Sequence, residues 1–270
     1  MLFVCPKCGL PFKVGENNNL ICSAGHSYDR AAAGYYNLLH SDGGIHGDNR
    51  EMVAARRTFL EAGYYLPLAE RVAALVAEHT PSGGTVLDAG CGEGYYTEKI
   101  ERALSAAHGQ SRVYAFDISK DAVRRAAKTS RGVTFAVASS YHMPVSDGTV
   151  NTVVNLFSPM AKDEVERVLK NNGRFIFVFP EEEHLFGLKA AIYDTPYKNK
   201  PQPTDIDGFR LVLDERLRYT VELCNKESIT ALFYMTPYAY RTPPESRKRV
   251  LSLEKLNTDA DFRILVYEKI

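Results

Sequence analysis

The sequence predicts an α/β fold, in which a Rossmann-like, doubly wound parallel sheet follows a small N-terminal metal-binding domain. Helical and strand patterns alternate from about residue 66 to residue 190, as a parallel sheet with crossover helices requires. The segment "VLDAGCGEGYYT", which begins at residue 86, has the order strand, glycine turn, helix. Three of the five cysteines lie within residues 5 to 26. These observations divide the chain into a large domain with a ligand-binding glycine loop and a small domain that binds a metal.

The composition limits the classes of function. The chain has 270 residues, of which 45% are hydrophobic and 24% charged, and its formal net charge is zero. It is long enough for one large core and a small appended domain, and any basic surface for nucleic acid must be local. No apolar run approaches the roughly 20 residues of a membrane helix, and the start "MLFVCPKC" lacks the pattern of a secretory signal. We therefore expect a cytoplasmic protein with reduced thiols.

The N-terminal segment carries two pairs of metal ligands. Cys5 and Cys8 form a C-x2-C pair, and Cys22 and His26 form a C-x3-H pair. Two such pairs joined by a short loop are typical of a tetrahedral zinc site, and four protein ligands make the zinc structural rather than catalytic. A disulfide or a chance cluster is the alternative, which a reducing compartment disfavours. We expect the core of the large domain to exclude this metal.

A linker and two helices are predicted before the first strand of the sheet. The stretch "HSDGGIHGDNR" has two glycine turns and no apolar periodicity. We place the small domain at residues 1–40, the linker at residues 41–50 and the large domain at residues 51–270. The next thirty residues predict two helices that are broken near Gly63 and Pro67. Arg56 and Arg57 lie in the middle of the first helix, where we expect solvated side chains.

The glycine loop indicates which ligand the large domain binds. A dinucleotide fingerprint would need glycine at position 95, where the chain has Tyr95. A carboxylate at Asp88 would repel phosphates but attract an ammonium group. S-adenosylmethionine (AdoMet) carries an ammonium, a carboxylate and a sulfonium but no phosphate, and its carboxylate suits a helix N-terminus. The loop resembles the first motif of class I AdoMet-dependent methyltransferases, although a glycine turn without a ligand remains the alternative. The cofactor-binding residues predicted in it are Asp88, Gly90, Gly92, Glu93 and Gly94.

The later strands complete the predicted sheet. The strand "RVYAFDIS" ends at Asp117, which is placed to bind ribose hydroxyls or to cap the following helix. The third strand leads to Ser139, where many class I methyltransferases have an aspartate facing the adenine. The fourth strand, "VNTVVNLFSP", is expected to end in a loop over the cleft. The remaining predicted strands are "LKNNGRFIFVFP", "RLRYTVELC" and "FRILVYEK".

One aromatic segment points to RNA. "FYMTPYAYR" places four aromatic side chains beside Arg241, and unpaired bases are recognised by stacking on such rings with arginine nearby. The alternative for each ring is packing in the core. The aromatic residues are Phe233, Tyr234, Tyr238 and Tyr240. The short basic runs "ESRKRV" and "VRRAAK" are interpreted as solvated helix faces.

The zinc pattern, "EMVAARRTFLEAGYY", "LDAGCGEGYYT" and "MTPYAYR", in this order, resemble bacterial large-subunit ribosomal RNA (guanine-N1)-methyltransferases. The resemblance covers essentially the whole chain. It implies methyl transfer from AdoMet to N1 of a guanine in a ribosomal RNA hairpin loop, with the zinc domain helping to hold the RNA. It also implies a homodimer, and contacts of Tyr65 and His184 with AdoMet. The alternatives for these two residues are a tyrosine packed between helices and a solvent-facing histidine.

Two other functions compete with this interpretation. A small-molecule methyltransferase would share the fold, but the zinc domain and the aromatic segment argue against it. A non-enzymatic RNA-binding protein would not require an intact Asp88 and Asp117. No general base is evident for the guanine N1 proton. His142, Asn155 and Glu181 follow predicted strand ends, and no catalytic role is assigned to them.

Overall fold

The computed structural model describes residues 1–39, 47–109 and 112–270, so residues 41–46 of the predicted linker lie outside the described part. Its main feature is an eight-stranded sheet with the order β10-β11-β9-β8-β5-β6-β7-β4. The strands from β4 to β9 in this sheet run parallel, whereas β11 and β10 are antiparallel additions at one edge. The bounds are β4 Tyr36–Asn37, β5 Thr85–Ala89, β6 Arg112–Asp117, β7 Val133–Val137, β8 Val150–Leu156, β9 Leu169–Pro180, β10 Phe209–Leu223 and β11 Leu256–Lys269. The predicted doubly wound sheet is confirmed.

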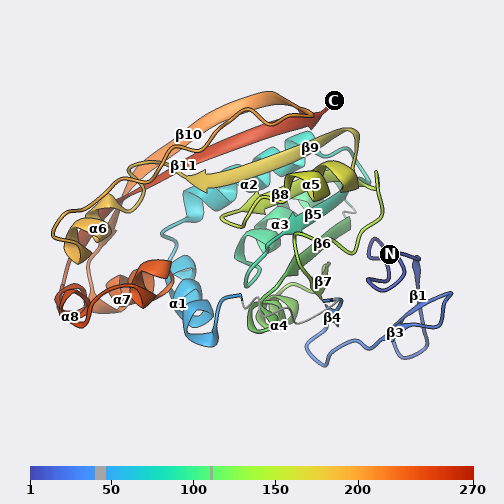
Figure 1. The fold of residues 1–270 in the computed structure, drawn as a ribbon, viewed down its shortest axis with the longest axis horizontal. Helices are drawn as coiled ribbons and strands as arrows, with labels where there is room; N and C mark the ends of the chain where they lie inside the picture. The colour runs from blue at the N-terminus through green and yellow to red at the C-terminus, as the bar shows by residue number, and fades with distance from the viewer. Residues whose placement is uncertain (40–46, 110–111) are drawn as a thin grey trace.

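Helices cover the sheet and close its carboxyl end. α1, α6, α7 and α8 gather at the end to which β9 points, away from the chain termini (Figure 1). The predicted break between the first two helices is confirmed at Gly63, which has φ +85°. Among the helices of the described residues, none has the length and apolar character to cross a membrane. The bounds are α1 Arg50–Glu61, α2 Leu66–His79, α3 Tyr95–His108, α4 Lys120–Thr129, α5 Lys162–Val168, α6 Phe186–Ile192, α7 Lys226–Tyr234, η1 Pro237–Tyr240 and α8 Pro244–Leu251.

The N-terminal segment forms its own small sheet and then joins the large one. β1 (Phe12–Val14), β2 (Leu20–Cys22) and β3 (Ser27–Tyr28) form an antiparallel sheet. The next strand, β4, pairs in parallel with β7, with Tyr36 opposite Ala136. The Leu38 amide extends this contact by donating to the Val137 carbonyl at 2.9 Å. The large sheet therefore ends in a strand that belongs to the N-terminal segment (Figure 1).

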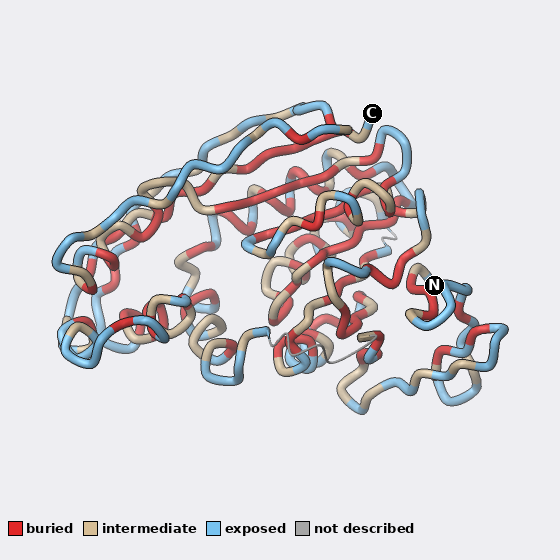
Figure 2. The backbone as a smooth tube through the Cα atoms, viewed as in Figure 1, coloured by how far each residue is buried: buried red, intermediate tan, exposed pale blue. Residues whose placement is uncertain are grey.

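The two parts also share buried side chains. Phe3, Cys5 and Leu38 belong to the same buried cluster as Leu87 and Phe116 of the central strands. Figure 2 shows the buried backbone of the central strands continuing toward the N-terminal segment. The expectation that the core of the large domain excludes the metal is therefore wrong, because the predicted ligands Cys5 and Cys22 lie in this shared cluster. The physical reason is size, because some forty residues bury too little apolar surface by themselves and gain more by covering a sheet edge.

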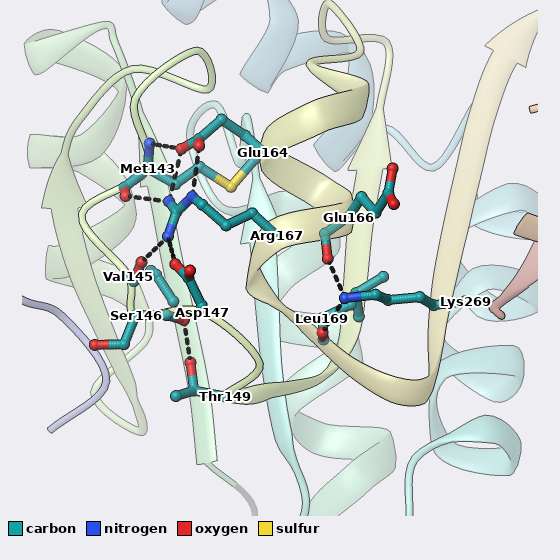
Figure 3. Close-up of polar contacts among 10 residues, drawn as sticks. All are labelled: Met143, Val145, Ser146, Asp147, Thr149, Glu164, Glu166, Arg167, Leu169 and Lys269. Carbon is teal, nitrogen blue, oxygen red and sulfur yellow. Dashed lines mark hydrogen bonds and ion pairs between the residues drawn. The ribbon is translucent and has the colours of Figure 1, made fainter. Parts of the chain in front are cut away.

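An arginine clamp shapes the loop on which the N-terminus docks (Figure 3). The guanidinium of Arg167 donates to both carboxylate oxygens of Glu164, at 2.6 and 2.8 Å. It also donates to the Met143 and Val145 carbonyls at 3.0 and 2.7 Å, and to the Asp147 carboxylate at 2.7 Å. Because Phe3 forms an isolated antiparallel β-bridge with Val145, this clamp holds the surface that receives the N-terminal segment.

The same view shows how the last strand is tied to α5. The Lys269 ammonium donates to the carbonyls of Glu166 and Leu169, at 2.6 and 2.9 Å (Figure 3). A cation at the C-terminus of a helix satisfies carbonyls that have no partner within the helix and complements the helix dipole. Lys269 thus closes the carboxyl end of α5 against β11.

Candidate active site

A cavity of about 490 Å³ lies at the carboxyl ends of the central strands. Its walls come from α1, the loop after β5, the end of β6, the loop after β8, the end of β9 and the segment Met235–Tyr238. Ligands of doubly wound folds bind in this position, beyond the carboxyl ends of the strands. A second cavity of about 320 Å³, beside Glu93, contains neither Asp88 nor Asp117. The larger cavity is therefore the candidate ligand site.

Asp88 presents a carboxylate that its surroundings satisfy only in part. Its side chain is 1% exposed, and Oδ2 accepts a hydrogen bond from the Thr97 hydroxyl at 2.6 Å. Oδ1 has no partner among the described residues. Burial raises the pKa of Asp88 to about 7. A buried carboxylate oxygen without a partner, on the wall of a cavity, suits a cationic ligand group such as the ammonium of AdoMet.

The glycines of the loop have different tasks. Gly90 and Gly92 line the cavity with φ of +92° and +54°, a conformation in which other residues are strained. A Cβ atom on Gly90 would lie 2.4 Å from the Ser158 hydroxyl oxygen, whereas one on Gly92 would lie 3.8 Å from the Arg56 guanidinium, an ordinary contact distance. Gly94 does not line this cavity. A Cβ atom on Gly94 would lie 2.8 Å from that of Ala126, so this glycine permits close packing of the loop on α4.

Asp117 lies at the end of β6, where its carboxylate is hydrogen-bonded to the glycine loop. Its Oδ2 accepts from the Gly92 amide at 2.9 Å and its Oδ1 from the Ser119 amide at 2.7 Å. The cap of α4 is supplied by Ser119 itself, whose hydroxyl accepts from the Ala122 amide. Asp117 therefore does not cap that helix. Burial raises the pKa of its carboxyl, and the side chain lines the cavity where ribose hydroxyls are expected.

The two arginines of α1 are not freely solvated, and that expectation is wrong. The Arg56 guanidinium pairs with Asp48 and lines the cavity next to Gly92. The Arg57 guanidinium lies 3.8 Å from the carboxylate of Glu93, which is 5% exposed and lies between the two cavities. The helical pattern of the sequence could not reveal this, because the break at residue 63 decides how α1 folds over the glycine loop.

Tyr65 and His184 meet at the wall of the cavity. The Tyr65 hydroxyl lies 3.3 Å from Nε2 of His184, and the two side chains are 4% and 8% exposed. The Asp261 amide donates to Nδ1 of the histidine at 3.2 Å, and burial lowers the pKa of His184 to about 3. The interpretation of His184 as solvent-facing is therefore wrong. Tyr65 also packs edge-on against Phe59 and Phe262, so it is both a core residue and part of the wall.

The predicted loop over the cleft and the aromatic segment both reach the cavity. Leu156, Phe157, Ser158 and Pro159 line it from the end of β8. From the aromatic segment, Tyr238 lines the cavity, whereas Phe233 is fully buried in the core and Tyr240 is 47% exposed. Packing in the core is therefore confirmed for Phe233, whereas the stacking role stays a prediction for the rings that reach the cavity or the surface.

Three side chains that follow predicted strand ends remain outside the cavity wall. His142, Asn155 and Glu181 do not occur in its lining within the part of the chain that the structure describes. Asn155 is 1% exposed, and its amide donates to the Pro159 carbonyl at 3.3 Å. Its side chain thus ties the end of β8 to the loop that follows it.

The four predicted metal ligands converge. The ligand atoms of Cys5, Cys8, Cys22 and His26 all lie within 4.8 Å of one another. Sγ of Cys8 and Sγ of Cys22 are 3.7 Å apart, and all five cysteines are free. A tetrahedral zinc with bonds of about 2.3 Å to sulfur separates two thiolates by about 3.8 Å, so the arrangement fits zinc and not a disulfide.

Comparison with known proteins agrees with both parts of the structure. A family model described as "RlmA, N-terminal" matches residues 3–41, and one described as "Methyltransferase domain" matches residues 86–176. A solved structure, the YcgJ protein of Bacillus subtilis, has a TM-score of 0.51 and 15% identity. The match covers 74% of this chain and 97% of that one, and it shows the shared fold.

Relatives that match almost the whole chain identify its family. The 23S rRNA (guanine(748)-N(1))-methyltransferase of Streptomyces fradiae is 31% identical over 252 residues, which cover 91% of this chain and 88% of that protein. A relative from Micromonospora griseorubida, whose name assigns it guanine-N1 activity provisionally, is 33% identical over 98% of this chain and 97% of its own. The zinc-ligand cluster, the glycine loop and the cavity are thus found in a chain that matches these proteins almost end to end. The chain belongs to the family of 23S rRNA (guanine-N1)-methyltransferases.

Proposed function

We propose that this chain transfers a methyl group from AdoMet to N1 of one guanine in a hairpin loop of 23S ribosomal RNA. The observation that carries the proposal is the mixed character of the cavity wall. It contains the buried carboxylate of Asp88, the carboxylate of Asp117 beside Gly92, and the aromatic rings of Phe157 and Tyr238. Such a wall suits a cationic cofactor together with a flat aromatic acceptor.

The residues of the cofactor part each suit one group of AdoMet, which supplies an activated methyl group when bound. Asp88 accepts the ammonium group, and Asp117 accepts the ribose hydroxyls, while Gly92 leaves room for close approach of the ligand. The Tyr65 hydroxyl and His184 close the wall on the side of β9. Because the donor is already reactive, the protein contributes mainly by holding donor and acceptor in line.

The acceptor must lose the N1 proton of guanine during the reaction, and His184 is not suited to take it. Its Nδ1 is occupied by the Asp261 amide, its Nε2 faces Tyr65, and its pKa of about 3 makes it a weak base. We therefore assign His184 to the cofactor wall and not to proton transfer.

The zinc-binding segment, residues 1–40, is proposed to position the RNA hairpin relative to the large domain at residues 51–270. This proposal is supported by the pairing of β4 with β7, which fixes the zinc-binding segment to the large sheet. We further propose that the chain acts as a homodimer in the cytoplasm, where ribosomal RNA is methylated. Light scattering coupled to size-exclusion chromatography tests the dimer, and a mass equal to one chain would contradict it.

The decisive experiment uses 23S rRNA from cells that lack this methylation. The protein is incubated with the RNA and radiolabelled AdoMet, and the label is mapped by nuclease digestion and primer extension. We expect one labelled guanine in a hairpin loop, methylated at N1. Binding of RNA and AdoMet without label would indicate a non-enzymatic RNA-binding protein. AdoMet binding without RNA binding would indicate a methyltransferase for small molecules.

A further inference from the structure

Phe157 combines two features that are each unfavourable. It has φ +57°, in the left-handed region that bulky side chains avoid. Its aromatic side chain is also 42% exposed, although it lies on the wall of the cavity. A glycine or an asparagine would relieve the first cost, and a polar residue would relieve the second. A residue at a ligand cavity that has both a strained backbone and an exposed aromatic side chain is a candidate for a functional role.

The surrounding structure holds this conformation firmly. The Phe157 amide donates to the Val178 carbonyl at 3.0 Å, which ties the loop to β9. The ring packs against Phe262 and Tyr96, with centroids 5.5 and 6.2 Å away. The next residue, Ser158, occupies the space in which a side chain on Gly90 would lie. The ring is therefore presented to the cavity on a rigid support.

The order of the strands places Phe157 and Asp117 on opposite sides of Asp88. Asp88 is on β5 and Asp117 is on β6, so the groups of the cofactor assigned to these two carboxylates lie between β5 and β6. Phe157 follows β8, which lies on the opposite side of β5. The cavity wall also contains Pro159 and Tyr238, neither of which is charged. An uncharged, aromatic portion of the wall suits the acceptor base.

We propose that Phe157 is the stacking platform for the target base. The exposed face of the ring packs against the extruded guanine and orients N1 toward the methyl donor. Bases that leave a loop or helix are commonly held on aromatic faces, because every base has a flat π surface. This inference rests on the proposed function and adds the residue that positions its substrate.

Steady-state kinetics with 23S rRNA test the role of the ring. We expect Phe157→Leu to lower kcat/KM for the RNA about ten- to a hundredfold, the size expected for loss of one base–aromatic stack. Phe157→Tyr keeps the ring and should stay within about threefold of wild type. The matched control is Tyr141→Leu, which removes a ring that is 55% exposed and absent from the described cavity wall, and should leave kcat/KM unchanged. Calorimetry should show wild-type AdoMet affinity in all three variants, because the proposed role places the ring against the base and not against the cofactor.

A binding measurement supplements the kinetics, because the chain contains no tryptophan. In Phe157→Trp, with S-adenosylhomocysteine bound, indole emission should fall on addition of the RNA, while emission from Tyr141→Trp should not change. Unchanged emission, or a Phe157→Leu variant with wild-type kcat/KM, would overturn the stacking role while leaving the proposed function intact. An equal loss of AdoMet affinity in Phe157→Leu would also overturn it, by making the ring a cofactor contact. A wild-type protein that does not methylate 23S rRNA would instead overturn the proposed function together with this role.

Discussion

The hydroxyl oxygen of Tyr65 lies 3.3 Å from Nε2 of His184, although the two residues are 119 positions apart in the chain. Because the Asp261 amide donates to Nδ1 of this neutral histidine, the ring proton must be on Nε2. Nε2 then donates to the Tyr65 oxygen, which leaves the tyrosine proton free to point into the cavity. The pair therefore presents one oriented O–H donor to the ligand.

This arrangement predicts the effect of removing a single oxygen. Tyr65→Phe keeps the packing against Phe59 and Phe262 but removes the donor. We expect AdoMet affinity, measured by calorimetry, to fall about tenfold, and similarly in His184→Ala, which no longer orients the hydroxyl. RNA binding without cofactor should change little. Wild-type affinity in Tyr65→Phe would show that the hydroxyl does not contact the cofactor.

Asp88 predicts a proton release on cofactor binding. With a pKa of about 7, its carboxyl is mostly protonated at pH 6 in the ligand-free protein. Pairing with an ammonium group favours the ionised form, so AdoMet should bind more tightly as pH rises from 6 to 8. Calorimetry near pH 6.5 in buffers of different ionisation enthalpy should detect release of up to about one proton. Asp88→Asn should bind more weakly and release none, and buffer-independent enthalpies for the wild type would contradict the pairing.

His184 predicts a dependence of stability on pH. Its pKa is about 3 in the folded protein, against an ordinary value of 6.5, so the unfolded chain binds a proton that the folded chain excludes. The free energy of unfolding should therefore fall as pH falls below about 6.5, by up to about 1.4 kcal/mol per pH unit from this group.

Asp88 acts in the opposite direction, because its raised pKa stabilises the folded state at low pH and this contribution is lost as pH rises toward 7. The test is consequently a comparison of urea unfolding between wild type and His184→Gln from pH 7.5 to 5. The stability of the wild type relative to the variant should decline as pH falls. A constant difference would refute the buried, neutral state of His184.

The zinc ligands predict a loss of stability that extends beyond the small sheet. Metal analysis should find one zinc per chain in the wild type and none in Cys8→Ser combined with Cys22→Ser. Because the two parts share a core and the pairing of β4 with β7, the melting temperature of the whole chain should fall, by about 5 °C or more. Cys224→Ser removes an exposed cysteine that is not a ligand and is the matched control. A melting temperature unchanged by zinc loss would show that the two parts are energetically independent.

The Arg167 clamp predicts a further loss of stability. Arg167→Met removes hydrogen bonds to Glu164, Asp147 and two carbonyls, and should lower the free energy of unfolding by about 1–3 kcal/mol. Arg102→Met breaks an exposed pair with Glu98 within one helix and should cost no more than about 0.5 kcal/mol. Urea denaturation measures both, and equal effects would show that the clamp is no stronger than a surface ion pair.

The sequence by itself determined those features whose geometry is local. The spacing of Cys5, Cys8, Cys22 and His26 predicts a cluster because each pair lies on one short turn. The glycine loop and the strand ending at Asp117 follow equally from neighbouring residues, since a buried strand, a turn with positive φ and a helix each leave a local pattern.

Only the tertiary structure decided which distant segments meet. The attachment of β4 to β7, the position of Arg56 over the glycine loop and the pairing of Tyr65 with His184 all depend on packing between segments far apart in the chain. Phe157 shows the same limit at a single residue, because a strand pattern ending in "NLFSP" contains no sign of a left-handed backbone. The periodicity of a sequence indicates which face of a helix or strand is buried. It does not indicate which distant segment packs against that face, because close packing of the shared core decides this. These contacts could therefore be identified only from the tertiary structure.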